Sequence, residues 1–400
     1  MYRKNLFLLA SCQCLTLSST SLMMTTSALV GMLLAPEPTL ATLPLGLVYL
    51  SVMLTMIPAS MLMKHYGRRV GFALGGCAGL VGGMIAGFGI YHDSFLLFCV
   101  GSSVIGIANG FAQYYRFAAA EIVAESYKSR AIAWVLAGGL VAAFIGPNAG
   151  NLTRDLLPGT YFSASYIALG LFSLGVVLIQ WFIRIPLPSV EESSGPRRPL
   201  GRIMMQPAFL VAVLCAMIAY GTMNLLMTTT PLAMNLRHMD FDQTAIVIQW
   251  HLVGMFAPSF FTGHLIYRFG LFKIMFAGAI MLLTCILIAL AGQTFPHFVV
   301  GLVLLGVGWN FLYIGGTTLL TEVYTPAEKG SIQGINEFLI FTTTALTALS
   351  SGYLHHTVGW EALNRYIIPV IFFAACIIAL LGWRANGRKP QNTGIKIPVS

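Results

Sequence analysis

The sequence contains an internal repeat whose period is close to half of its 400 residues. At an offset of 203 residues, the segment 21–27 aligns with 224–230, and Leu, Met, Thr and Thr recur at aligned positions. The same offset aligns 60–67 with 263–270, and both segments end in glycine. Solenoid repeats have periods of tens of residues, whereas a period of half the chain is typical of membrane proteins with two related halves. We therefore expect a duplicated bundle.

Composition places this bundle in a membrane. Hydrophobic residues make up 57% of the chain and charged residues 9%, whereas soluble domains carry roughly 25% charged residues. The net charge of +9 comes from basic residues dispersed over short loops, so it does not indicate nucleic-acid binding. We expect the lipid bilayer to be the partner of this surface.

Apolar runs of about twenty residues indicate membrane-spanning helices. They predict an all-α integral membrane protein in which twelve transmembrane helices form two pseudo-symmetric six-helix bundles. The bundles are expected at 1–184 and at 207–400, which ends in a short cytoplasmic tail, with a cytoplasmic linker rich in Pro, Ser and charge at 185–206. The runs lie near 6–34, 43–63, 70–91, 95–120, 130–153, 161–184, 207–232, 243–267, 273–292, 297–320, 331–354 and 366–384.

Lysine and arginine indicate the orientation of these spans. With the N-terminus inside, eighteen of the 22 basic residues fall in inside loops and only Arg154, Arg237 and Arg365 fall in outside loops, while Arg116 lies within a span. Such an excess follows the positive-inside rule. It predicts that both termini are cytoplasmic, in what we expect to be the inner membrane of a bacterium.

The third span carries a glycine at every fourth position from Gly71 to Gly87. This spacing removes side chains from one helix face and lets a neighbouring helix approach closely. We expect packing within the bundle; a dimer face is the alternative.

Two halves of six spans with basic loops after the second and eighth spans resemble the major facilitator superfamily. Gly67, Arg68 and Arg69 match the end of its loop signature, Gly-(x)3-Asp-Arg-x-Gly-Arg-Arg, while Ser60 and Lys64 replace its first glycine and its aspartate. The corresponding loop of the second half also lacks the acid. The resemblance implies alternating access around a cavity lined by the first, fourth, seventh and tenth helices.

A second motif lies in the fifth span. The run Gly146-Pro147-Asn148-Ala149-Gly150 resembles the Gly-Pro-x-x-Gly-Gly element of antiporter subfamilies. Proline removes a backbone hydrogen bond and glycine allows a helix to bend. We therefore predict a hinge at Gly146 and Pro147.

The two halves end their fourth and tenth spans with acids at matching positions, Glu121 and Glu322. We expect Arg68 or Arg69 to pair with Glu121, and Arg268 with Glu322, which would close the cytoplasmic face in the outward-open state. The alternative is that these charges face water and lipid headgroups.

Polar side chains within spans indicate a cavity, because a polar group in lipid is costly unless it meets a partner or water. Helical spacing groups them on faces of the spans named by the resemblance and of the eighth span. Serine and threonine could instead bond to carbonyls of their own helix. The predicted substrate-cavity residues are Ser21, Thr25, Asn109, Gln113, Arg116, Asn224, Thr228, Trp250, His251, Trp309, Asn310 and Tyr313.

Two titratable residues within spans are candidates for proton coupling. Glu337 lies eight residues after Lys329 in the eleventh span, and burial would favour its protonated form. His251 needs little change to titrate near neutrality. The alternatives are that Glu337 is a structural carboxylate, paired for example with Arg268, and that His251 is a simple hydrogen-bond donor.

These observations predict a secondary transporter that moves a small organic solute by alternating access and is coupled to protons. The Gly146-Pro147 pair favours efflux, and uptake of a nutrient, metabolite or vitamin-like compound is the alternative. A sensor without transport is less favoured because the chain carries no sizeable soluble domain. The sequence indicates no enzyme, metal site or cofactor, and a monomer is expected.

Overall fold

The computed structural model describes residues 2–123, 128–183, 198–325 and 328–387. Within these ranges, twelve further side chains lie outside the description, at 64, 120, 121, 128–130, 132, 133, 329 and 385–387. The predicted linker at 185–206 lies partly between the described ranges, which end at 183 and resume at 198, so its boundaries stay a prediction.

The first half consists of long apolar helices joined by short turns. Helical structure satisfies every backbone N–H and C=O within the segment, which an apolar run in lipid requires. One expected span is divided, because α4 ends at Ala112 and α5 begins at Tyr115. The elements are α1 (Tyr2–Leu34), η1 (Pro38–Leu40), α2 (Leu43–Tyr66), α3 (Arg68–Tyr91), α4 (Phe95–Ala112), α5 (Tyr115–Glu121), α6 (Lys128–Thr153) and α7 (Ser163–Gln180).

The second half has the same character, with two departures from the expected spans. The eighth span is bent by 43° between α10 and α11. The expected loop between the last two spans is helical except at Gly359, whose φ of 76° breaks α14 into two helical stretches. The elements are α8 (Leu200–Met204), α9 (Pro207–Leu236), α10 (Phe241–Phe256), α11 (Ser259–Phe269), α12 (Leu271–Ala291), α13 (Phe295–Thr321) and α14 (Lys329–Gly387).

By length and composition, ten helices of the described residues can cross a membrane, and the bent pair α10–α11 makes eleven. Helix α14 counts once in this total although Gly359 divides it. The structure therefore shows an all-helical membrane protein, and the total of twelve spans stays a prediction.

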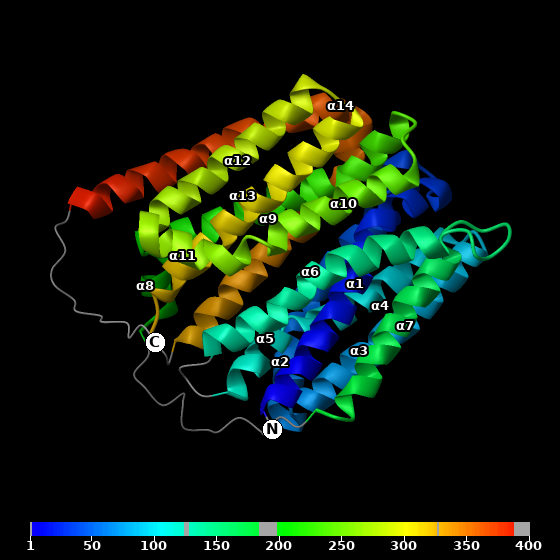
Figure 1. The fold of residues 1–400 in the computed structure, drawn as a ribbon, viewed down its shortest axis with the longest axis horizontal. Helices are drawn as coiled ribbons and strands as arrows, with labels where there is room; N and C mark the ends of the chain where they lie inside the picture. Colours follow the sequence, from blue (N-terminus) through cyan, green and yellow to red (C-terminus); the bar gives the residue numbers. More distant parts are fainter. Residues whose placement is uncertain (1, 124–127, 184–197, 326–327, 388–400) are drawn as a thin grey trace.

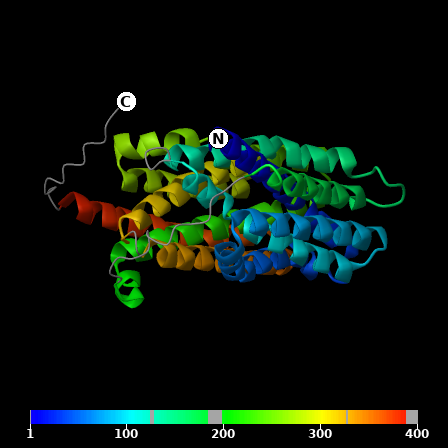
Figure 2. The ribbon, with the colours of Figure 1, turned by 90° about the horizontal axis from the view of Figure 1, so that it is seen from below.

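The two halves lie side by side, with helices α1–α7, coloured from blue to green, next to helices α8–α14, coloured from green to red (Figure 1). The view from below shows the same division (Figure 2). One buried apolar cluster lies wholly in the first half, and another is formed by the second half together with Ala143 of α6. Helices α2 and α6 pack against α14 and α10 across the boundary. We call the end that carries Tyr2 and α8 the terminal end, and the end that carries the turns after α1 and α6 the loop end.

The glycine face of α3 packs within the first half, as expected. A Cβ on Gly83 would lie 2.7 Å from the backbone nitrogen of Gly170 in α7, and one on Gly82 would lie 2.7 Å from that of Ile105 in α4. Any side chain here would force α7 or α4 away from α3.

Polar contacts close the loop end between the halves. Arg154, just after α6, forms an ion pair with Asp242 of α10 at 2.7 Å, and Asn148 donates to the side-chain oxygen of Gln249 at 3.0 Å. Thr42, before α2, donates to the Ala348 carbonyl of α14 at 3.0 Å. We call the pair of Arg154 and Asp242 the loop-end ion pair.

Candidate substrate site between the halves

An aromatic cluster from three helices of the second half faces the first half. The rings of Trp309 and Tyr313, on α13, stack with centroids 5.0 Å apart and planes 19° apart. Tyr220 of α9 meets both rings edge-on at 5.1 Å, and Phe341 of α14 lies 6.3 Å from Tyr220. Offset stacks and edge contacts of this kind are favourable beyond their buried area. We call these four residues the aromatic cluster.

Arg116 of α5 reaches this cluster from the first half. One terminal nitrogen of its guanidinium donates to the Tyr313 hydroxyl at 3.0 Å, and the other forms an ion pair with Glu337 of α14 at 3.1 Å. The side chains of Arg116 and Glu337 are 21% and 14% exposed, so the pair is largely sheltered from solvent. It connects the two halves with no net charge.

Two donors of this site are buried and have no partner within the described part of the chain. They are Nε of Arg116 and the indole nitrogen of Trp309. A buried N–H without an acceptor costs roughly 1–3 kcal/mol, so each is a position where a ligand oxygen or ring nitrogen would be stabilised. Flat rings, an arginine and free N–H donors together suit a planar heteroaromatic ligand that carries acceptors.

Of the predicted cavity residues, the structure brings only Arg116, Trp309 and Tyr313 together at this site. Asn109 lies against α1, where its side-chain oxygen accepts from Thr20 at 3.4 Å. Gln113 is half-buried at the C-terminal end of α4.

The serine and threonine of α1 take part in packing and in bonds to helix carbonyls. Ser21 donates to the Ser18 carbonyl and to the Ala142 carbonyl of α6, and the fully buried Thr25 donates to the Ser21 carbonyl. The alternative of local back-bonding therefore describes them in this structure. Ser21 thus lies at the contact between α1 and α6, and the predicted role of both residues on the cavity wall stays a prediction.

The polar pair on α9 is likewise buried. Asn224 donates to the Thr344 carbonyl and to the Thr347 hydroxyl of α14, at 3.0 and 3.1 Å. Thr228 is 2% exposed. The spacing places both on one helix face, and at Asn224 that face packs against α14.

Asn310 stabilises the bend between α10 and α11 instead of lining a cavity. Its amide nitrogen donates to the Met255 carbonyl and to the Ser259 hydroxyl, and its oxygen accepts from the Thr262 hydroxyl, all at 2.7 Å. Pro258 lies at the break and has no N–H. Asn310 therefore supplies hydrogen bonds to backbone and side-chain groups around the break.

The structure also gives the surroundings of the two remaining residues of the eighth span. The His251 ring is fully buried, with Nδ1 2.7 Å from the Leu302 carbonyl of α13, so it joins two helices of one half. Trp250 is 45% exposed, on the same face of α10 as the exposed Ile246. This face is apolar and suits contact with lipid.

The predicted gate pairs are not seen among the described ion pairs. Arg268 and Glu322 form none with each other, and the Arg268 guanidinium lies 5.4 Å from the ring centroid of Phe269. Arg69 donates to the Trp181 carbonyl, and the Arg68 guanidinium lies over the Tyr114 ring. The Glu121 side chain lies outside the described residues. Because the latch was expected in the outward-open state, it stays a prediction.

The predicted hinge lies in a continuous helix. Helix α6 runs through Pro147 without a break, and Gly146 packs on α1, where its added Cβ would lie 2.5 Å from the Ser18 carbonyl. Gly146→Val would therefore disturb packing between helices before it tested bending.

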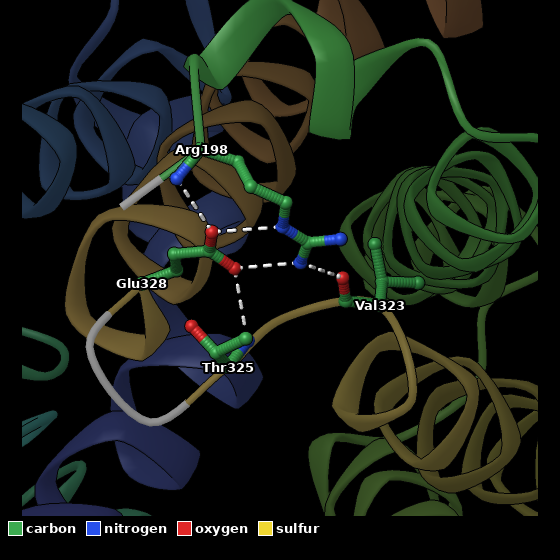
Figure 3. A network of polar contacts seen from close by, with 4 residues as sticks. All are labelled: Arg198, Val323, Thr325 and Glu328. Carbon is green, nitrogen blue, oxygen red and sulfur yellow. Dashed lines mark hydrogen bonds and ion pairs between the residues drawn. The ribbon is translucent and has the colours of Figure 1, made fainter. Parts of the chain in front are cut away.

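An ion pair at the terminal end joins the buried Glu328 to the exposed Arg198 and was not predicted from the sequence. Arg198 lies two residues before the start of α8 at Leu200. Its side chain donates to both carboxylate oxygens of Glu328, at 2.8 and 2.6 Å, and to the Val323 carbonyl at 2.8 Å (Figure 3). The backbone N–H of Thr325 donates to the same carboxylate. The hydrogen bonds from Arg198 lower the pKa of Glu328 well below its usual range. We call this network the terminal-end clamp.

An apolar pocket lies on the flank of the second half, and Arg116 is not among its lining residues. It has a volume of about 340 Å³ between α9 and both stretches of α14, lined by residues such as Met217, Leu354 and Ile367. Its position and lining suit lipid chains and not a polar solute.

The fold and the inter-half site define a membrane transporter, and comparison with known proteins gives its family. The sequence profile of the Major Facilitator Superfamily matches residues 6–257 and 212–397. The chain belongs to this superfamily.

Individual relatives and structures are consistent with that assignment. The chain is 39% identical over 373 residues to the riboflavin transporter RfnT of Brucella anthropi, covering 92% of this chain and 93% of the relative. Its fold is similar to the xylose transporter XylE of E. coli (TM-score 0.70, 10% identity, 99% of both chains). It is also similar to the nucleoside transporter NupG (TM-score 0.69, 13% identity, 94% of this chain and 99% of that one).

Proposed function

We propose that this protein imports riboflavin, or a closely related uncharged heteroaromatic vitamin, by alternating access. The single observation that carries the proposal is the 39% identity to a riboflavin transporter over nearly the full length of both chains. Vitamin uptake, the alternative from the sequence, is thereby favoured over efflux.

The chemistry of the inter-half site supports this substrate. Riboflavin has a flat three-ring system whose carbonyl oxygens and ring nitrogens accept hydrogen bonds, and a flexible chain of hydroxyl groups. The stacked rings of Trp309 and Tyr313 are the planar apolar groups of this site. The unpartnered N–H groups of Arg116 and Trp309 offer donors to the ring acceptors. An uncharged ligand also suits the balanced charges of Arg116 and Glu337.

The contacts between the halves support a transport cycle. The contacts at the loop end include an ion pair and hydrogen bonds from Asn148 and Thr42. Arg116 lies elsewhere, five residues and so about 8 Å of helix before the C-terminal residue of α5, Glu121. Opening the loop end requires the first group of contacts to break, and opening the terminal end requires Arg116 to leave Glu337. With the termini in the cytoplasm, as the positive-inside pattern predicts, the loop end faces outside.

The test is growth and uptake in a bacterium that can neither synthesise nor import riboflavin. Expression of the chain should restore growth on micromolar riboflavin and give saturable uptake of labelled riboflavin. Right-side-out vesicles should accumulate the vitamin when energised. Accumulation only in inside-out vesicles would establish efflux, and saturable transport of other solutes but not of riboflavin would overturn the proposed substrate.

A further inference from the structure

We propose that Glu337 determines the charge selectivity of the site: by neutralising Arg116, it makes the site accept an uncharged flavin and reject a phosphorylated one. This inference rests on the proposed function and names the residue that separates riboflavin from its phosphate ester.

Glu337 is the acid that faces the Arg116 guanidinium. The Arg116 guanidinium has three nitrogens: one donates to Tyr313, one pairs with the Glu337 carboxylate at 3.1 Å, and Nε has no partner in the described part of the chain. The Tyr313 contact leaves the charge of the arginine unchanged. The carboxylate of Glu337 is therefore the described group that compensates it.

The charge of the ligand decides how it interacts with the pair of Arg116 and Glu337. A phosphate monoester brings roughly −1.5 to −2 charges at neutral pH. Near a free arginine it would gain a strong charge-assisted, often bidentate, interaction. Next to the existing pair it meets nearly equal attraction and repulsion, while its own desolvation remains uncompensated. A neutral flavin incurs no such cost, because carbonyl and ring-nitrogen acceptors need only N–H donors.

The pair lies beside the aromatic cluster. Arg116 contacts the same Tyr313 that stacks on Trp309, so a ring seated on the aromatic cluster lies beside the guanidinium. Exposures of 21% and 14% place the pair where solvent screens it only in part, and the effect of one charge is then larger than at an open surface.

The experiment measures selectivity as a ratio. Purified protein in detergent is titrated with riboflavin and with flavin mononucleotide, and quenching of flavin fluorescence gives a dissociation constant for each. The wild type should bind riboflavin at least about tenfold more tightly. Glu337→Gln should move the ratio toward the mononucleotide by at least about tenfold, which corresponds to roughly 1.4 kcal/mol.

Further variants separate charge selectivity from a structural role. Arg116→Gln should move the ratio in the opposite direction, and the double variant should return toward the wild type, because the two charges cancel. Glu361→Gln is the matched control. Glu361 lies on the same α14, pairs with Arg365 at 3.4 Å and is exposed, so its removal should leave the ratio unchanged.

The outcomes distinguish the two proposals. No saturable riboflavin binding by folded wild type would overturn the proposed function. Riboflavin binding by the wild type, with an unchanged ratio in Glu337→Gln or a shift in the same direction in both single variants, would overturn the role of Glu337 alone. If Glu337→Gln does not fold, the shift in Arg116→Gln decides, since loss of the arginine must strengthen rejection of the phosphate.

Discussion

At the scale of single residues, Trp309 carries the largest ring of the aromatic cluster and is 5% exposed. Trp309→Ala should weaken riboflavin binding about three- to tenfold, because a ring–ring contact is worth about 0.5–1.5 kcal/mol. Flavin titration measures the change. Trp250→Ala is the matched control, since Trp250 lies on an exposed apolar face of α10. Equal losses in the two variants would show that the aromatic cluster has no special role.

Asn310 gives a prediction about stability. Asn310→Ala should lower the free energy of unfolding by about 1–2 kcal/mol, because carbonyl and hydroxyl groups at the bend lose their partner in a dry interior. Thermal unfolding in detergent, followed by size-exclusion fluorescence, measures it. Asn148→Ala, at an exposed asparagine between the halves, should cost less. A normal melting temperature combined with lost transport would restore the cavity role that the sequence indicated.

Residue positions could be predicted only in part, for a physical reason. The sequence marks polar groups in apolar runs, and so it singled out Arg116, Trp309 and Tyr313. Helical spacing gives faces but not the neighbour each face meets, so Asn224 and Asn310 were assigned to a cavity although both bond within their half. Tyr220 carried no signal beyond being an aromatic residue in an apolar span.

At the scale of elements, the terminal-end clamp joins Arg198, just before α8, to Glu328, just before α14. Because the pKa of Glu328 is lowered, its stabilising effect is complete above the ordinary glutamate pKa of about 4.3 and is lost as pH falls toward the lowered value. The difference in melting temperature between wild type and Glu328→Gln should therefore be constant from pH 8 to about 5.5 and shrink in acid. A difference that grew as pH fell would contradict the clamp.

The loop-end ion pair should bias the cycle weakly. Arg154 and Asp242 are 26% and 57% exposed, and pairs of this kind contribute about 0.2–1 kcal/mol. Arg154→Ala should open the loop end slightly, by less than about fivefold, as measured by the labelling rate of a cysteine placed on that face of α10. A double-mutant cycle with Asp242→Ala gives the coupling. Labelling unchanged in Arg154→Ala would show that α6 and α10 are held by their other contacts alone.

Element boundaries show which signals in the sequence are strong. Long apolar runs with short polar interruptions gave the helices well. The bend at Pro258 and the break at Gly359 depend on backbone groups whose partners come from elsewhere, such as Asn310. The glycine at 359 could have marked the second break in the sequence. Many glycines of this chain serve close packing instead, however, so a glycine alone does not predict a break.

At the scale of the whole molecule, the repeat and the composition were sufficient for the fold class. Each half must bury a few polar residues among apolar helices. The repeat indicates that both halves do so with the same arrangement of helices. The substrate could not be derived in the same way, because the site forms only where residues of α5, α9, α13 and α14 meet. Such a meeting depends on the rotation of each helix, which no single span specifies.

The two candidates for proton coupling, Glu337 and His251, lie in different surroundings. His251 is enclosed by its own half, whereas Glu337 forms an ion pair with Arg116 across the boundary between the halves. We propose that this pair breaks when the halves separate during alternating access. A driving ion that exchanges with the pair would then be linked to one conformation, as coupled transport requires.

If transport is coupled in this way, Glu337→Gln should lose accumulation driven by a proton gradient by a larger factor than it loses exchange of labelled for unlabelled riboflavin. Exchange needs the site and the movement of the halves, but no net proton transfer. Both rates are measured in proteoliposomes, with Glu361→Gln as the control. Equal losses would make Glu337 a binding or gating residue only. Full accumulation in the variant would show that the driving ion is carried elsewhere, or that riboflavin simply equilibrates across the membrane.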